Sequence, residues 1–114
     1  MRAALPWFVI VNPAAGGGRA RRRWPALRAA LKHAGLPIRW VETTRAGEAG
    51  QLAADAVAAG ERQLLVVGGD GSLHEVVNGL YAQDAAPLEQ VVVAAAPCGS
   101  GNDWARTMGF PAAP

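Results

Sequence analysis

The chain has 114 residues, of which 51% are hydrophobic and 18% are charged, and its formal net charge is +2. This length allows one small domain with a single core, and no apolar run approaches the ~20 residues that span a bilayer. Cys98 is the only cysteine, which excludes an intrachain disulfide and makes a reducing cytoplasm the expected setting. A secretory signal is not expected, because Asn12, Pro13 and a glycine run stand where a cleavage site would fall. The small net charge argues against nucleic acid as a partner.

The first part of the chain predicts a strand, a glycine-rich loop and a helix. Residues 7–11 are apolar throughout, as in a parallel strand that is buried on both faces. A flexible loop is expected over 12–18. From about 19 to 34, apolar residues recur at helical spacing, with arginines on the other face. Pro25 leaves two starts open for this helix: just before the proline, which then lies in the first turn, or at Arg19, with the proline as a kink.

A second strand and helix follow. Gly35 is expected to cap the end of the first helix. Residues 38–41 then form a short apolar run, which predicts a strand. Thr43 or Thr44 is expected to cap an alanine-rich helix over about 47–59, since threonine hydroxyls accept hydrogen bonds from the first N–H groups of a helix.

The last part of the chain repeats this alternation twice. Residues 64–67 predict a third strand, and residues 73–81 predict a helix with one apolar stripe. Residues 91–96 predict a fourth strand. Glycine-containing turns follow both strands, at 68–72 and at 98–103, and the second one leads into a short helix.

The alternation of strands and helices predicts an α/β fold in which a parallel sheet is flanked by helices, as in Rossmann-like domains. Ligands of such sheets bind beyond the carboxyl ends of the strands. The unusual turns of this chain all follow strands, so they are expected to meet at that edge: they are 12–18, 43–44, 68–72 and 99–103. Their coincidence favours a nucleotide site.

The turn over 68–72 has the composition of an anion-binding loop. Gly68, Gly69 and Gly71 permit close approach to the backbone, and the start of the following helix offers N–H groups and the positive end of its dipole. Asp70 would repel a bare phosphate. Its carboxylate therefore indicates either a divalent metal between the two or a turn-forming role of its own.

Several polar side chains around this turn have two interpretations each. Ser72 and Glu75 match a capping box, which is a structural role. His74 lies in the first helical turn, within reach of an anion, or is simply solvated. Four arginines of the first helix form either a patch for anionic lipid headgroups or a solvated helix face, and the solvated face is favoured. These arginines are Arg19, Arg21, Arg22 and Arg23.

Three motifs resemble one known family. Residues 68–80 are similar to the nucleotide-binding signature of the diacylglycerol kinase catalytic domain family, which includes bacterial lipid kinases and sphingosine kinases. Asn12-Pro13 with the glycines after it, and residues 97–103, resemble the two other signatures of that family in the same order. The family usually has threonine where Ser72 and Ser100 stand, so the hydroxyl is kept.

The resemblance implies the amino-terminal fold of diacylglycerol kinases and NAD kinases, an ATP site with Mg²⁺, and a lipid hydroxyl as the acceptor of the γ-phosphate. Asp70 would help to hold the magnesium-bound phosphates. The residues implied to bind the cofactor are Asn12, Thr43, Gly68, Gly69, Asp70, Gly71, Ser72, Leu73, His74, Glu75, Gly99, Ser100 and Asn102.

The resemblance also implies that residues 1–114 are only the nucleotide-binding lobe of a longer enzyme. The family places its catalytic base in a later lobe, so no catalytic residue is expected in this chain, and the fragment alone is expected to be inactive. Two alternatives stay open: a non-catalytic nucleotide-binding or regulatory module, and a small-molecule kinase similar to NAD kinase. A cytoplasmic protein is expected, with peripheral contact at the inner membrane and self-association through the face that lacks its second lobe.

Overall fold

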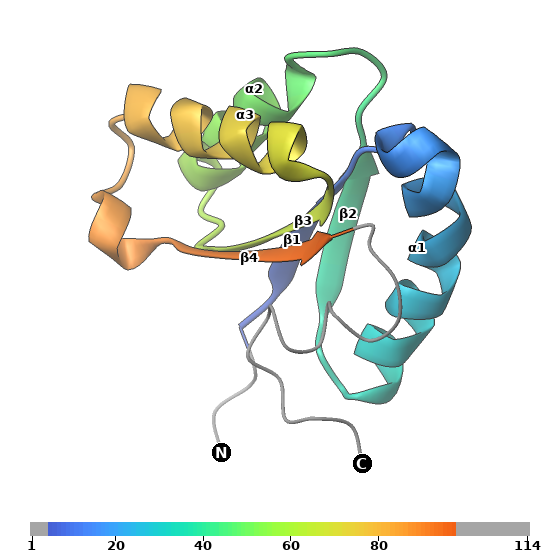
Figure 1. Ribbon diagram of the computed structural model, residues 1–114. Coiled ribbons are helices and arrows are strands. Elements are labelled where there is room, and N and C mark those ends of the chain that lie inside the picture. Colours follow the sequence, from blue (N-terminus) through green and yellow to red (C-terminus); the bar gives the residue numbers. More distant parts are fainter. Residues whose placement is uncertain (1–4, 98–114) are drawn as a thin grey trace.

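The computed structural model describes residues 5–97 of the chain. The expectations for residues 98–114, which are the second glycine-containing turn and the short helix after it, lie outside the described residues. The described part is a four-stranded parallel sheet with helices on both of its faces (Figure 1), which confirms the predicted α/β fold. Its elements are β1 (Trp7–Val11), α1 (Ala15–His33), β2 (Ile38–Glu42), α2 (Glu48–Ala58), β3 (Gln63–Gly68), α3 (Asp70–Ala82), the 3₁₀ helix η1 (Leu88–Gln90) and β4 (Val92–Pro97).

The strand order β2-β1-β3-β4 explains why the helices lie on opposite faces. The chain moves outward from β1 to β2, and then returns past β1 to β3. Because crossovers between parallel strands are right-handed, a reversal of direction transfers the connecting helix to the other face. Accordingly α1 covers one face of the sheet, while α2 and α3 lie side by side on the other (Figure 1).

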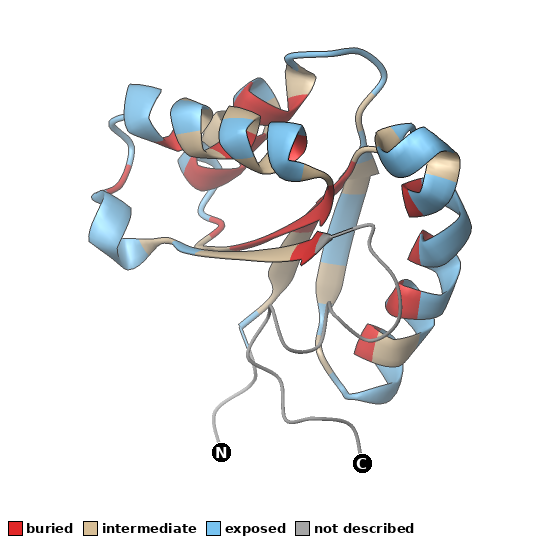
Figure 2. Ribbon diagram, in the orientation of Figure 1, coloured by how far each residue is buried: buried red, intermediate tan, exposed pale blue. Residues whose placement is uncertain are grey.

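Two hydrophobic clusters hold these layers together, one on each face of the sheet (Figure 2). Alternate residues of a strand point to opposite faces, so neighbouring residues of β1 and β3 enter different clusters. Val9 and Leu65 pack with α1, whereas Ile10 and Leu64 pack with α2 and α3. The central strands are therefore apolar on both sides, as the sequence predicted.

The first helix follows the longer of the two predicted starts. Gly16, Gly17 and Gly18 have φ angles of 65°, 67° and 95°, so right-handed helix begins only after them, at Arg19. Pro25 lies inside the helix and cannot donate the backbone hydrogen bond expected there. The predicted flexible loop over 12–18 is thus partly a left-handed glycine turn that feeds directly into α1.

The end of α1 confirms the glycine cap. Gly35 has a φ of 79° and follows the last helical residues. Its N–H donates to the Lys32 carbonyl at 3.0 Å, and the Leu36 N–H donates to the Leu31 carbonyl at 3.1 Å. These two bonds form a Schellman motif, which satisfies carbonyls that the helix leaves free.

The predicted threonine cap of α2 is wrong. The residue that precedes this helix is Gly47, with a φ of 84°, and no side chain caps it. The bond runs the other way: Glu48 Oε1 accepts hydrogen bonds from the Thr44 N–H at 2.6 Å and from the Thr44 hydroxyl at 3.1 Å. These bonds stabilise the carboxylate and lower the pKa of Glu48. Glu48 therefore holds the loop after β2 in place.

Candidate functional site at the carboxyl edge of the sheet

The turns after the first three strands meet at one edge of the sheet, as the topology predicted. The strands are in register, with Val11 of β1 opposite Glu42 of β2 and Val67 of β3. Asn12, Thr43 and Gly68 therefore end up at the same edge. The chain reverses its direction of winding between β1 and β3, and ligands of open parallel sheets bind at such a switch point.

Asn12 joins the two turns that flank this switch point. Its Nδ2 donates a hydrogen bond to Ser72 Oγ at 2.9 Å, across 60 residues of sequence. Its backbone N–H donates to the Val67 carbonyl at 2.8 Å, and its Oδ1 accepts from the Ala14 N–H at 3.3 Å. The amide thus fixes the end of β1 against the beginning of α3. Sequence reasoning had proposed both residues for the site but had not paired them.

The predicted capping box of α3 is also wrong, because Ser72 does not lie at the position before the helix. The helix begins at Asp70, and Gly69 precedes it in an extended conformation without a side-chain cap. Ser72 consequently lies inside the first turn, where it is buried and accepts the bond from Asn12. Glu75 is one further turn into the helix. The S-x-x-E pattern is present, but a long-range partner has taken the serine.

The glycines of the turn fall into two kinds. A Cβ on Gly68 would lie 2.8 Å from Ser72 Oγ and 3.4 Å from the Asn12 Cβ, so tight packing of the Asn12–Ser72 pair requires a glycine there. Gly69 and Gly71 have no other residue within 4 Å of a Cβ, and neither has a positive φ. Neither the backbone nor a neighbour requires glycine at these two positions. What their missing side chains provide is open space directly over the backbone, as a phosphate cradle needs.

The beginning of α3 supplies the donors that such a cradle needs. The first intrahelical bond runs from the Leu73 N–H to the Gly69 carbonyl at 3.2 Å. The N–H groups of the three residues before Leu73 have no carbonyl four residues back within the helix, as at any helix start. At a helix start such N–H groups, with the positive end of the helix dipole behind them, are able to bind an anion.

The other residues predicted for the site differ in how far they are exposed to solvent. Asp70 and His74 are exposed, and Leu73 and Glu75 are half-buried. In the part of the chain that the structure describes, no group of three His, Cys, Asp or Glu side chains could hold a metal ion. Gly99, Ser100 and Asn102 lie outside the described residues.

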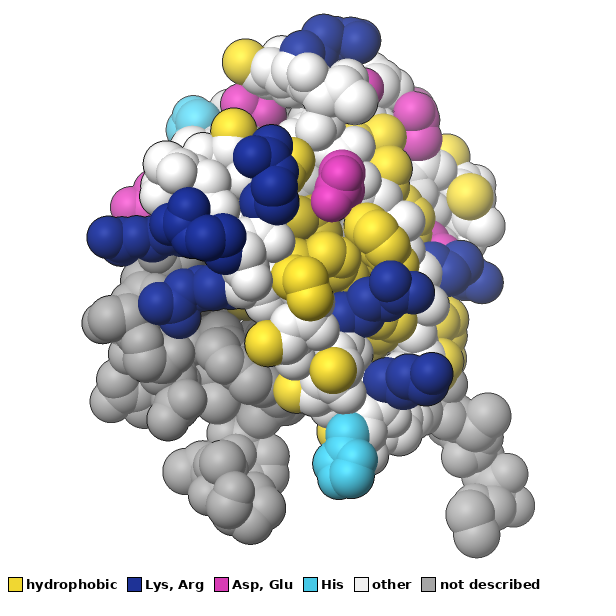
Figure 3. Space-filling view, turned by 90° about the vertical axis from the view of Figure 1, so that its right-hand side faces the viewer, with side chains coloured by type: hydrophobic (Ala, Val, Ile, Leu, Met, Phe, Trp, Pro, Cys, Tyr) yellow, Lys and Arg dark blue, Asp and Glu magenta, His cyan; other side chains and the backbone are white. Residues whose placement is uncertain are grey.

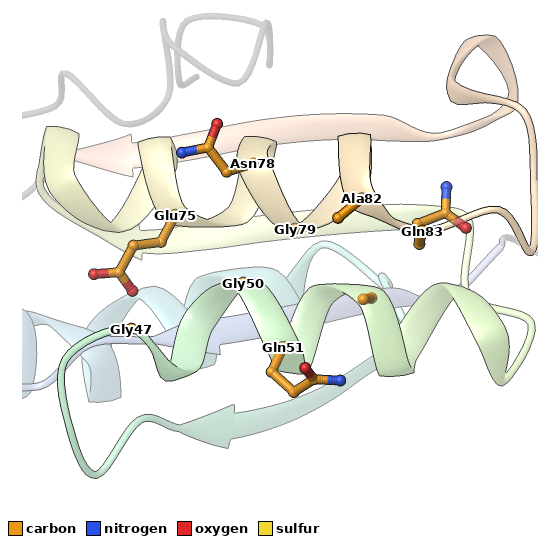
Figure 4. Close-up of a pocket in the computed structure, with 9 residues that line it drawn as sticks. Gly47, Gly50, Gln51, Glu75, Asn78, Gly79, Ala82 and Gln83 are labelled. Carbon is orange, nitrogen blue, oxygen red and sulfur yellow. The ribbon is translucent and has the colours of Figure 1, made fainter.

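Glu75 lines a different feature, an open groove of about 500 Å³ between α2 and α3 (Figure 4). In Figure 4 its carboxylate extends from α3 toward the end of α2 that Gly47 marks. Beneath the groove the backbones of the two helices approach each other closely at Gly50 and Gly79. A Cβ built on Gly79 would lie only 2.2 Å from the Gly50 carbonyl oxygen. Glu75 therefore sits between the edge of the sheet and this groove.

The fold and the carboxyl edge of its sheet define the class of protein. It is a doubly wound parallel α/β domain in which a glycine turn and the start of a helix lie at the switch point of the sheet. The family within this class follows from comparison. Residues 6–114 match the model of the diacylglycerol kinase catalytic domain, and the chain belongs to that family.

Individual relatives agree with this membership. The chain is 33% identical over 103 residues to a diacylglycerol kinase of Bacillus subtilis, covering 90% of this chain and 33% of the relative. It is 35% identical over 102 residues to a diacylglycerol kinase of Mycobacterium tuberculosis, covering 90% and 31%. A crystal structure of a diacylglycerol kinase from Bacillus anthracis superposes with a TM-score of 0.61 at 28% identity, covering 97% of this chain and 40% of that one. The chain thus spans about a third of the length of the curated relatives that it matches.

Among residues 5–97, none of the helices is both long enough and apolar enough to cross a membrane.

Proposed function

We propose that this chain is the ATP-binding lobe of a lipid kinase, which transfers the γ-phosphate of ATP to a lipid hydroxyl. The observation that carries the proposal is the Asn12–Ser72 hydrogen bond of 2.9 Å beside two glycines, Gly69 and Gly71, that no contact or backbone angle requires. Membership of the diacylglycerol kinase catalytic domain family supports the same reading.

The residues at the edge have distinct roles in this proposal. Phosphate oxygens accept hydrogen bonds from the free N–H groups at the start of α3, and the open glycines let them approach. Asp70 holds the magnesium ion that neutralises the phosphates. Asn12 positions the glycine turn through Ser72. Thr43, Leu73 and His74 belong to the same site in this proposal. Glu75, Gly99, Ser100 and Asn102 are assigned to nucleotide binding on the sequence motifs alone.

The acceptor hydroxyl needs a base, and the two carboxylates nearest to the glycine turn are already assigned to other tasks. Asp70 faces the phosphates, and Glu75 turns toward the groove between α2 and α3. We therefore place the catalytic base, and the pocket for the lipid, in a second lobe beyond residue 114. This placement agrees with the lengths of the relatives, since the chain covers about a third of the length of each one that it matches.

Gly69→Val is expected to abolish binding of magnesium-ADP while leaving the melting temperature within about 2 °C of the parent, because the new side chain enters open space rather than the core. Isothermal titration calorimetry measures the binding, and thermal unfolding measures the stability. Ala85→Val, on an exposed loop, serves as the matched control and should bind normally. Undiminished binding by the Gly69 variant, or no binding by the parent chain, would contradict the site.

Asp70→Asn is expected to weaken ADP binding at least 10-fold in the presence of magnesium, and much less when EDTA replaces the metal. The reason is that the substitution removes a metal ligand but keeps the size of an exposed side chain. Titrations of parent and variant with and without magnesium give the comparison. Equal losses in both conditions would show that Asp70 acts on the turn and not through a metal.

A further inference from the structure

The loop over 43–47 is the part of the carboxyl edge that follows β2, an edge strand of the sheet. It joins the end of β2 at Glu42 to the start of α2 at Glu48. Residues 44–47 are exposed, whereas Thr43 is half-buried. The loop lies at the top of the molecule in Figure 1, and in Figure 3 the same end of the molecule carries a basic side chain at its outer surface. An exposed loop of this kind gains little from packing and depends on hydrogen bonds for its shape.

The backbone ties this loop near its two ends. The Thr43 N–H donates to the Val11 carbonyl at 2.8 Å, which continues the pairing of β2 with β1. At the other end, the Glu48 N–H reaches the Arg45 carbonyl at a long 3.4 Å, and Gly47 precedes α2 without a side-chain cap. Between these ends, the partner of the Thr44 N–H is a carboxylate and not a carbonyl.

That carboxylate belongs to Glu48. Its Oε1 accepts from the Thr44 N–H at 2.6 Å and from the Thr44 hydroxyl at 3.1 Å. The bond from the Thr44 N–H lowers the pKa of Glu48, so the acceptor is ionised at neutral pH and the bonds are charge-assisted. Its Oε2 lies 3.7 Å from the guanidinium of Arg45, whose side chain is 76% exposed, and an ion pair so open to solvent contributes little. The two bonds to Thr44 are therefore the main tie of the loop.

The residue directly before Thr44 is Thr43, which was predicted for the nucleotide site. Glu42 pairs with Val11, so the residues that follow them, Thr43 and Asn12, come to the same place on the edge. The Thr43 hydroxyl takes part in none of the side-chain hydrogen bonds found among residues 5–97. A hydroxyl both donates and accepts, so this one is available to a ligand at the edge.

We propose that Glu48 is a positioning residue of the nucleotide site, which holds the loop over 43–47 so that the Thr43 hydroxyl reaches the bound nucleotide. The inference rests on the proposed function, because it gives Glu48 a task in that same site. Glu48 itself does not contact the nucleotide, since its two carboxylate oxygens are directed at Thr44 and Arg45. Sequence reasoning assigned no role to Glu48, because an acidic residue at a helix start ordinarily only complements the helix dipole.

Calorimetric titration with magnesium-ADP compares the parent chain with two variants at this position. Glu48→Ala should weaken binding about fivefold, the worth of one ordinary hydrogen bond, because Thr43 is no longer held in place. Glu48→Gln keeps an oxygen that accepts both bonds from Thr44 but loses the charge, so its affinity should stay within about twofold of the parent. The matched control is Asp55→Ala, which removes a carboxylate and the 2.8 Å bond from Gln51 in the same helix and should bind normally.

A cycle with Thr43→Val separates positioning from direct contact. If Glu48 acts through Thr43, the Glu48→Ala substitution should weaken binding little further once the Thr43 hydroxyl is gone. A carboxylate that contacted the nucleotide itself would behave differently. Glu48→Gln would then lose as much affinity as Glu48→Ala, and the losses at positions 43 and 48 would add.

Limited digestion with trypsin, in the absence of nucleotide, reports on the loop itself. Cleavage after Arg45 requires the loop to open, so Glu48→Ala should be cut there about fivefold faster than the parent, and Glu48→Gln should not. Unchanged cleavage or unchanged nucleotide affinity of Glu48→Ala would each overturn the positioning role and leave the nucleotide site of the parent standing. A parent chain that does not bind magnesium-ADP would overturn both the site and the role of Glu48 in it.

Discussion

Replacing Gly79 by alanine is expected to lower the free energy of unfolding by about 3 kcal/mol, although alanine is the better helix former. A Cβ at this position would lie 2.2 Å from the Gly50 carbonyl oxygen and 2.7 Å from the Gly50 Cα. Both atoms belong to the backbone of α2, so no flexible side chain can move aside. The two helices would have to separate, and this would disturb the core cluster that they share with β1 and β3.

Gly71→Ala is the matched control for this prediction. It introduces the same methyl group into the same helix, but no other residue lies within 4 Å of the new atom. Chemical denaturation of the two variants should therefore give an intact or slightly raised stability for Gly71→Ala and a large loss for Gly79→Ala. Similar stabilities for the two variants would show that the Gly50–Gly79 contact is looser than the structure indicates.

The sheet could be predicted from the sequence because each strand and each helix is marked by a pattern of neighbouring residues. Four short apolar runs alternate with helical patterns, and an alternation of this kind has few solutions: parallel strands, helices on both faces and turns collected at one edge. The bounds of the strands moved by only one residue, as when Leu64 to Val67 became Gln63–Gly68. Position along the chain was enough to bring Asn12, Thr43 and Gly68 to the same edge.

What could not be predicted depends on partners that are distant in sequence. By sequence, Ser72 and Glu75 match a local capping box. In the structure Ser72 instead accepts a hydrogen bond from Asn12, which is 60 residues away. The threonines before α2 look like caps, but a glycine with positive φ precedes the helix and Glu48 reaches back to Thr44. In both cases a side chain had two acceptable bonds, and tertiary packing chose between them. Gly50 and Gly79 show the same effect, since only the fold reveals that they touch.

The Asn12–Ser72 pair leads to the second prediction of large effect. Ser72→Ala should weaken magnesium-ADP binding about 10-fold and lower the stability by about 1–2 kcal/mol, because it leaves the Asn12 amide without the partner that it holds at 2.9 Å. Ser72→Thr keeps the hydroxyl and should retain most of both properties. Calorimetric titration and denaturant unfolding measure the two quantities.

A double-mutant cycle with Asn12→Ala decides whether these losses come from the pair itself. If the hydrogen bond positions the glycine turn, each single variant already breaks it, so the double variant should cost clearly less than the two single losses added together. The coupling is expected to be about 1 kcal/mol in stability and to appear in nucleotide affinity as well. Strictly additive losses would mean that Asn12 and Ser72 act separately. The connection between the end of β1 and the start of α3 would then not be what shapes the site.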